Sequence, residues 1–443
     1  MSVSFSVQQV LRIRQRAPKS CGRRPNSPEG TAWLMPPLIN ARNGSVPVTD
    51  ADLTVTNARI LDGIAGGPVD GSIRIEAGRI VEIGPGVIPG DHVIDARGAS
   101  VLPGLIDAHC HAFAIYLTGS GGIPMTYVGL MGARRLTAAL RRGFTTVRDP
   151  AGGDPAFARA ASEGLFPAPR YLYTGAPMSQ TGGHGDPRPP ESSACVHDSH
   201  IVDGVDDLRR ATRDRFRQGA HAIKIMTSGG VISPSDPIAI PQYSAEEIRA
   251  VVDEARRRHS YVIAHSYSAE AVQHSVVNGV RSIEHGNLID AETATIMADH
   301  DAFLVPTLIA YDAISRRAAG LGLPPVSVQK NGEVLSSGQQ AIALARDAGV
   351  RIGFGSDLMG ELEDEQLGGL QLQSEVLGVP ETIKCATATN ADLIQRDDLG
   401  RLMPGAVGDL LILDGDVLAD PAALWDDKRP RTVVRSGQIV VAP

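Results

Sequence analysis

The pattern of hydrophobic and polar positions divides the chain into two β-rich ends and a middle of alternating strand-like and helix-like segments. Residues 53–102 predict short strands joined by tight turns, because apolar and polar residues alternate in LTVTNARILDG and GSIRIEAGRIVEIGPG. The last part of the chain repeats this texture in GDLLILDGD and RTVVRSGQIVVAP. Since exposed strand edges need partners, we expect both ends to build one small β-sandwich.

The middle of the chain contains eight strand-like segments, which are GLIDAHCHA, FTTVRDP, PRYLYTG, HAIKIMTSGG, SYVIAHSY, RSIEHGN, AFLVPTLIAY and RIGFGSDLM. Amphipathic stretches lie between them, and one begins with a capping box in which Ser244 caps the helix and Glu247 reaches back. Eight βα units predict an α/β fold, a (β/α)8 TIM barrel. A doubly wound open sheet is the alternative, but no GxGxxG loop follows the first strand.

These patterns predict four regions along the chain. Residues 50–104 and 403–443 form the two parts of the β-sandwich, and residues 105–402 form the barrel. Residues 1–49 are a basic, Pro- and Gly-rich N-terminal extension. Its first 34 residues lack the apolar core of a signal peptide, so we expect a mobile tail or sequence upstream of a start near Met35 rather than a basic binding arm.

Composition narrows the function classes. With 42% hydrophobic and 21% charged residues, the chain is typical of a soluble globular protein. A net charge of -8 gives no reason to expect nucleic acid or an acidic membrane as partner, and no apolar run approaches the ~20 residues that cross a bilayer. Four scattered cysteines form no CxxC pair. With no export signal evident, they favour a cytoplasmic protein.

Metal-capable side chains lie near the ends of five predicted strands: His109, His111, Lys224, His265, His285 and Asp357. Each alone has an ordinary structural explanation, such as a hydrogen-bonded histidine or a helix-capping aspartate. In a barrel, however, the carboxyl ends of the strands converge. Burying four imidazoles, an ammonium and a carboxylate together is costly, and divalent metal would relieve that cost. Nitrogen and oxygen ligands suit zinc first, with Mn, Co or Ni as alternatives.

Lys224 is unusual in this set, because a protonated amine repels cations. Burial beside metals lowers the pKa of a lysine amine. The neutral amine could then add CO2 and become a carbamate, an anion whose two oxygens can bridge two metals. We therefore hypothesise a carbamylated Lys224.

The order of these residues, with the runs VLPGLIDAHCH and GFGSD, resembles the amidohydrolase superfamily. The runs KIMTSGGVISPSDPI, GVRSIEHGNLID and TGGHGD resemble its imidazolonepropionase-like and metal-dependent prolidase branch, which holds Xaa-Pro and N-acyl amino acid dipeptidases. The resemblance implies two divalent ions with a bridging hydroxide. In that arrangement His109, His111 and Asp357 bind the more buried metal, His265 and His285 bind the other, and carbamylated Lys224 bridges them. Some members work with one metal.

The resemblance also implies a reaction. Asp357 would accept a proton from the attacking water and later deliver it to the leaving nitrogen. The expected substrates are dipeptides, N-acyl amino acids or related small amides. The alternative is a cyclic amide, a urea or a carbamate. A non-catalytic scaffold is disfavoured because no ligand position is missing. By analogy with the family, the protein could form a homo-oligomer.

Two further residues are candidates for handling substrate. His184 in TGGHGD could donate to a substrate carbonyl or carboxylate, and its alternative is a surface loop histidine. Tyr267 follows His265 by two residues and should share its side of the strand. It could stabilise an oxyanion, and its alternative is a packing role.

Overall fold

The computed structural model describes residues 52–64, 67–117, 123–186, 199–233 and 236–442. The expected N-terminal extension, residues 1–49, lies outside these ranges. Among the described residues, none of the helices has the length and apolar character needed to cross a bilayer.

Eight parallel strands form the barrel, and each coincides with one of the eight segments that the sequence pattern predicts. They are β6 (Leu105–Asp107), β7 (Phe144–Asp149), β8 (Arg170–Tyr173), β11 (Ile223–Met226), β12 (Val262–Ser268), β13 (Ser282–Leu288), β14 (Phe303–Val305) and β15 (Arg351–Ile352). Two short strands, β9 (Met178–Ser179) and β10 (His200–Ile201), extend the sheet beside β11.

Backbone hydrogen bonds join the two sheets of the barrel at both seams. The amide of His221, before β11, donates to the carbonyl of Tyr173 in β8 at 2.8 Å. The amide of Ala108, after β6, donates to the carbonyl of Phe354, after β15, at 3.0 Å. The strands therefore close into the predicted (β/α)8 barrel, and their carboxyl ends face one common space.

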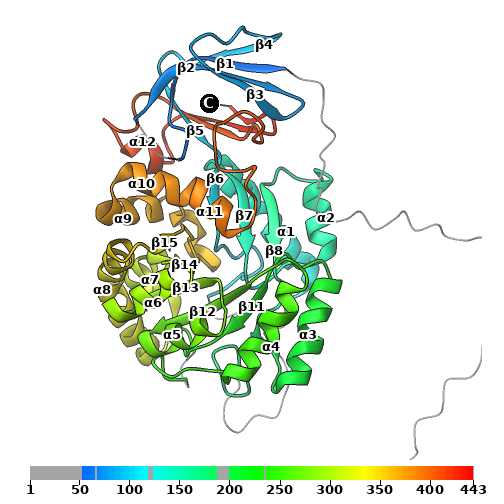
Figure 1. Cartoon of the computed structure of the whole chain (residues 1–443), viewed down its shortest axis with the longest axis vertical. Helices are drawn as coiled ribbons and strands as arrows, with labels where there is room; N and C mark the ends of the chain where they lie inside the picture. Colours follow the sequence, from blue (N-terminus) through cyan, green and yellow to red (C-terminus); the bar gives the residue numbers. More distant parts are fainter. Residues whose placement is uncertain (1–51, 65–66, 118–122, 187–198, 234–235, 443) are drawn as a thin grey trace, which may run out of the picture. The chain divides into compact units, whose positions relative to one another are not determined.

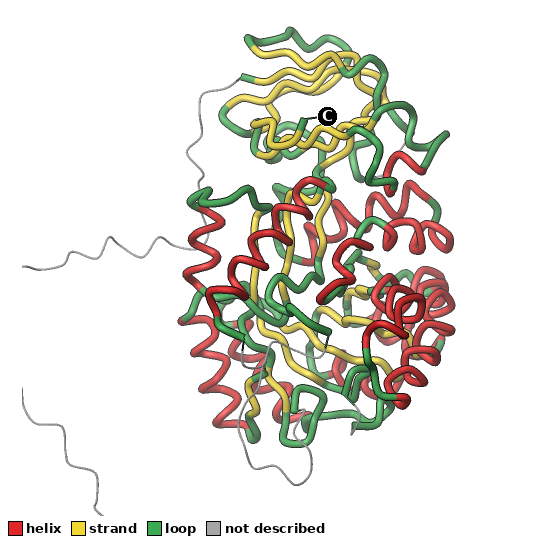
Figure 2. Tube along the Cα trace, turned by 180° about the vertical axis from the view of Figure 1, so that it is seen from behind, coloured by secondary structure: helices red, strands yellow, loops and turns green. Residues whose placement is uncertain are grey.

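Helices cover the outside of the barrel, as Figures 1 and 2 show. They are α1 (Met125–Arg141), α2 (Pro155–Ser162), α3 (Val205–Arg217), α4 (Ala245–Arg256), α5 (Ala269–Val277), α6 (Ala291–Asp299), α7 (Leu308–Leu321), α8 (Pro325–Asp347), the 3-10 helix η1 (Gly360–Glu365), α9 (Gly368–Leu377), α10 (Val379–Lys384), the π-helix η2 (Cys385–Thr389) and α11 (Asn390–Leu393). Helix α4 begins with the predicted capping box of Ser244 and Glu247. The apolar faces of these helices pack against the barrel strands in one large hydrophobic core.

The two ends of the chain build a second, smaller β domain, where the first blue strands and the last red strands lie together in Figure 1. Its strands are β1 (Leu53–Ile60), β2 (Val69–Glu76), β3 (Arg79–Gly84), β4 (His92–Asp95), β5 (Ser100–Pro103), β16 (Leu410–Leu413), β17 (Arg431–Arg435) and β18 (Gln438–Val441), with the short helix α12 (Ala422–Trp425) between β16 and β17. They form one continuous sheet in the order β18-β17-β16-β5-β1-β2-β3, with β4 beside β1.

This sheet curves around its own core instead of forming two separate sheets. Side chains from distant strands, including Val55, Ile73, Val101, Leu410 and Val434, are buried together. An isolated bridge joins Arg79 of the edge strand β3 to Val407, just before β16. Because β5 pairs with β16 and leads directly into β6, the small domain holds the first barrel strand in place.

Candidate metal centre

Three of the predicted ligands lie within one small, buried space. Donor atoms of His109, His285 and Asp357 are all within 4.8 Å of one another. These residues come from the loop after β6, from β13 and from the loop after β15. They span almost 250 positions of the sequence, from His109 to Asp357. The closed barrel brings them together at the carboxyl ends of its strands.

The other two predicted histidines adjoin this group. Nε2 of His111 lies 2.8 Å from Oδ1 of Asp357, and Nε2 of His109 lies 3.3 Å from the same oxygen. The rings of His265 and His285 are 4.6 Å apart between centroids. The structure therefore gathers the four histidines in one cluster, with His109, His111 and His285 beside Asp357 and His265 beside His285.

Lys224 lies in the same cluster. It is buried in β11, whose neighbouring Met226 pairs with His265 of β12. Burial lowers the pKa of the Lys224 amine to about 8, although Glu284 and Asp357 favour its charged form. Among the described residues, Lys224 has no ion-pair partner within 4.0 Å. A large fraction of such an amine is neutral near pH 8, which is the state that reacts with CO2.

The backbone at the strand ends is strained at three residues that surround the centre. His285, Thr307 and Asp357 have positive φ angles of 75°, 48° and 53°. For residues other than glycine, such a conformation costs about 1–3 kcal/mol each. At His285 it also breaks the alternation of side-chain direction along the strand, so that consecutive residues Glu284 and His285 both face the cluster. Such strain is typical of functional sites.

Glu284 and Arg148 support the centre, and the sequence analysis did not identify them. Oε2 of Glu284 lies 2.6 Å from Nδ1 of His109, and Oε1 accepts from Arg148 at 2.8 Å. Burial would raise the pKa of Glu284, but Arg148 and His109 hold it well below its usual range. The carboxylate therefore fixes the His109 ring and directs Nε2 toward Asp357. The sequence signal that could have identified these two residues is a charged side chain within an otherwise apolar strand segment, RSIEHGN for Glu284 and FTTVRDP for Arg148.

The hydroxyl groups of Tyr311 and Thr307 hold His285. Its Nδ1 lies 2.7 Å from the Tyr311 hydroxyl and 2.9 Å from that of Thr307. Tyr267 stacks on the His285 ring at 4.9 Å and contacts His265 at 5.0 Å, as the i, i+2 spacing predicts. The Tyr267 hydroxyl bonds to that of Tyr311 at 2.9 Å. Tyr267 is therefore buried beside the centre, and its hydroxyl is linked to His285 through the hydroxyl of Tyr311.

His184 also reaches the centre. Its ring stacks on His265 with 4.2 Å between centroids, and its Nδ1 lies 3.5 Å from Asp236. The sequence analysis missed the residue that holds this region, Lys330 of α8. The Lys330 ammonium donates to the carbonyls of Gly230, Ser233 and Asp236 at 2.6–3.0 Å. Lys330 thereby anchors the loop that positions the carboxylate beside His184.

Three of these donors, His265, His285 and Asp357, are in the protonation states that a divalent metal requires. Burial lowers the pKa of His265 and of His285 well below the usual value, so both imidazoles are neutral and offer a lone pair. Burial opposes ionisation of Asp357, but His109 and His111 hold its pKa well below the usual range, so it is a carboxylate. Burial would lower the pKa of His109, but Asp357 and Glu284 raise it, so a bound cation would displace a proton from this ring. Two neutral imidazoles and an ionised carboxylate fit divalent ions such as zinc.

Comparison with known proteins gives an independent identification. Residues 100–440 match the model of the amidohydrolase family. The ochratoxinase of Aspergillus niger is 29% identical over 467 aligned residues, covering 95% of this chain and 94% of that protein. The crystal structure of a prolidase complexed with N-methylphosphonate-L-proline is 39% identical, with a TM-score of 0.85 over 89% of this chain and 100% of that chain. A Xaa-Pro dipeptidase with bound methionine is 25% identical, with a TM-score of 0.79 over 89% and 100%.

The match to the family model spans the part of the chain that carries the barrel, and the positions of the six predicted ligands fall within it. The structural similarity extends over most of this chain and the whole of two solved relatives. The chain therefore belongs to the amidohydrolase family and is a hydrolase that acts on C–N bonds.

Proposed function

We propose that this enzyme hydrolyses small amides that release an amino acid, such as dipeptides and N-acyl amino acids. The observation that carries the proposal is the gathering of four imidazoles, a carboxylate and a buried lysine at the carboxyl ends of the barrel strands. The similarity to a prolidase and to an ochratoxinase supports an amide substrate.

The residues of this cluster would hold two divalent ions, and zinc is the first candidate for both. His109, His111 and Asp357 would hold one ion, and His265 and His285 the other. Lys224, as its carbamate, would contact both. When bound, the ions would lower the pKa of a water molecule and polarise the scissile carbonyl.

Asp357 is proposed to move the proton. Its carboxylate is ionised and oriented by His111 at 2.8 Å, so an oxygen can accept a proton from the attacking water. The same oxygen then donates that proton to the nitrogen that leaves as an amine. One residue therefore acts first as base and then as acid, and the net proton balance on the enzyme is zero.

His184 and Tyr267 are proposed to handle the substrate. His184 stacks on His265 and is half-buried, so its ring can donate to a substrate carbonyl or carboxylate. The hydroxyl of Tyr267 can donate to the oxygen that becomes negatively charged during attack. Such a contact requires that its hydrogen bond to Tyr311 be shared with or exchanged for one to substrate.

The carbamate on Lys224 forms from a neutral amine. The nitrogen makes a bond to the carbon of CO2, and the amine loses a proton to solvent. The lowered pKa of this buried lysine supports the reaction, because it increases the neutral fraction near neutral pH.

A substrate panel tests the proposed function. The zinc-loaded protein would be assayed with Xaa-Pro dipeptides, other dipeptides, N-acyl amino acids, hydantoins, imidazolonepropionate and phenylureas, and kcat/KM compared. We expect the highest values for dipeptides or N-acyl amino acids. Activity confined to the cyclic amides or ureas would favour the alternative function on the same centre.

The matched control for this panel is Asp357→Asn. It should lower kcat by about 10²–10⁴-fold, which is the usual contribution of general acid–base catalysis, while the melting temperature stays close to that of the wild type. Asp299→Asn, at an exposed position at the end of α6, should retain full activity.

A further inference from the structure

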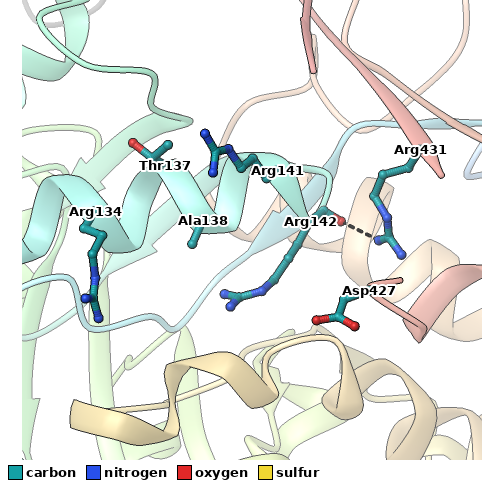
Figure 3. A pocket seen from close by; sticks show the side chains of 7 residues that line it. All are labelled: Arg134, Thr137, Ala138, Arg141, Arg142, Asp427 and Arg431. Carbon is teal, nitrogen blue, oxygen red and sulfur yellow. Dashed lines mark hydrogen bonds between the residues drawn. The ribbon is translucent and has the colours of Figure 1, made fainter. Parts of the chain in front are cut away.

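A cationic groove lies beside α1, outside the metal centre. Its cavity has a volume of about 530 Å³ and is lined by Arg134, Thr137, Ala138, Arg141, Arg142, Asp427 and Arg431. Figure 3 shows Arg134, Arg141 and Arg142 projecting from α1 and its C-terminal end, while Arg431 approaches Arg142 from β17. Four guanidinium groups therefore share one cavity with a single carboxylate.

The helix periodicity explains why the arginines form one wall. Arg134, Ala138 and Arg141 are spaced i, i+4 and i+7, so they share one face of α1. The small side chain of Ala138 leaves space between the two long ones. Arg134 and Arg141 are exposed, and neither has an ion-pair or side-chain hydrogen-bond partner among the described residues.

The opposite wall adds a buried cation. Arg431 is 6% exposed and donates to the backbone carbonyls of Arg142 at 2.9 Å and Asp426 at 2.7 Å. Neutral carbonyl groups do not cancel its charge. Burial lowers the pKa of Arg431, although Asp427 and Asp426 oppose this effect. An anion bound in the groove would therefore stabilise the buried positive charge of Arg431.

Neither the overall charge nor the helix dipole accounts for the cluster. The protein has a net charge of -8, so a local excess of arginine runs against its average. The negative end of a helix attracts cations only within the last turn. That attraction explains Arg141 and Arg142, but Arg134 lies two turns earlier.

We propose that this groove binds a small polyanion that carries at least two phosphate or carboxylate groups. The planar fork of arginine binds both kinds of oxyanion through paired hydrogen bonds. Arg134 and Arg141 stand two helical turns apart, about 10 Å along the axis, so each can take a separate anionic group of one molecule. The volume of the cavity accommodates a metabolite of that size.

The groove is separate from the metal centre but shares a residue with its surroundings. Arg142 also lines a cavity of about 30 Å³ that includes His111. Its guanidinium lies 3.4 Å from Oε1 of Gln366, whose amide donates to Asp107 at 2.8 Å. A binding measurement, which does not depend on turnover, therefore tests the groove independently of the proposed function.

Calorimetric titration of the full-length, zinc-loaded protein tests the proposal. The probes are fructose 1,6-bisphosphate, with two phosphates, and tricarballylate, with three carboxylates. We expect at least one to bind with a Kd below about 1 mM. Binding of only the bisphosphate identifies a phosphorylated ligand, and binding of only tricarballylate identifies a carboxylated one.

Arg134→Gln and Arg141→Gln should each weaken binding roughly tenfold, the contribution of one charge-assisted hydrogen-bonding group. Arg258→Gln, which removes the same charge from an exposed position after α4, should not change it. The proposal is wrong if neither probe binds with a Kd below about 1 mM, or if both groove variants bind as tightly as the wild type. Equal melting temperatures would show that the substitutions act on binding and not on folding.

Discussion

Oε2 of Glu284 lies 2.6 Å from Nδ1 of His109, and both side chains are buried. This contact assigns the two ring nitrogens of His109 to different tasks. Nδ1 bonds to the carboxylate, and Nε2 faces Asp357 at 3.3 Å. Carboxylates that hold a histidine in this way raise its basicity as a metal ligand.

Glu284→Gln should therefore weaken metal binding. A neutral amide holds the imidazole less strongly and leaves buried Arg148 without its counter-charge. We expect a 10–100-fold loss of zinc affinity, measured by competition with a chromophoric chelator. Glu292→Gln, in the exposed first turn of α6, is the matched control. Unchanged zinc affinity in Glu284→Gln would contradict this role.

Lys224→Ala tests the carbamate. Removing the lysine should reduce bound metal from about two equivalents toward one or none, with a parallel loss of turnover. Short-chain carboxylic acids such as acetate or propionate should partly restore both, since they can occupy the space of the carbamate. Elemental analysis after gel filtration measures the metal directly. If Lys224→Ala kept full metal and full activity, the carbamate hypothesis would be wrong.

Lys330→Met tests the anchor of the loop beside His184. Methionine keeps much of the side-chain volume but cannot donate to the three carbonyls. We expect kcat/KM to fall roughly tenfold, mainly through KM, because small displacements of substrate-positioning groups are costly. Zinc content should be unchanged. Lys428→Met, at an exposed position, is the control. A loss of zinc together with activity would show that the loop supports the metals instead.

Glu254 predicts a pH-dependent contribution to stability. It joins α4 to α3 through Arg209 and Arg213 and also accepts from Arg257. Hydrogen bonding to Arg213 lowers the pKa of Glu254 to about 2, against an ordinary value of 4.5. A lowered pKa in the folded state stabilises the protein above pH 4.5, and this contribution is lost as the pH falls from 4.5 toward 2.

Glu254→Gln should therefore lower the free energy of unfolding at pH 7 by about 1–2 kcal/mol, a value reduced for screening by solvent. The difference from the wild type should shrink as the pH falls through this window. Urea denaturation at pH 7, 5, 4 and 3 measures it. Glu246→Gln, exposed in the same helix, should show little difference at any pH. A gap that stays constant with pH would exclude the ionised carboxylate as its source.

Sequence reasoning predicted the framework of the centre well. All eight barrel strands coincide with apolar segments of the chain, because parallel strands covered by helices must be apolar. The pairing of β5 with β16 confirms that both termini build the small domain. The roles of the ligands, the oligomeric state and the cellular compartment stay predictions.

The supporting residues escaped sequence reasoning for a physical reason. Strand alternation places Glu284 and His285 on opposite sides, but the positive φ of His285 turns both toward the centre. Neither Tyr311 nor Lys330 lies at a strand end. Tyr311 reaches His285 from α7, and Lys330 of α8 holds the loop beside His184.

The sequence alone determined the order of elements and the chemical types of the ligands, since hydrophobic periodicity and residue identity are local properties. Tertiary structure alone decided which groups orient His109 and His285, and it alone placed Arg431 opposite the arginines of α1. Such contacts depend on barrel closure and on side-chain directions, which join residues far apart in the chain.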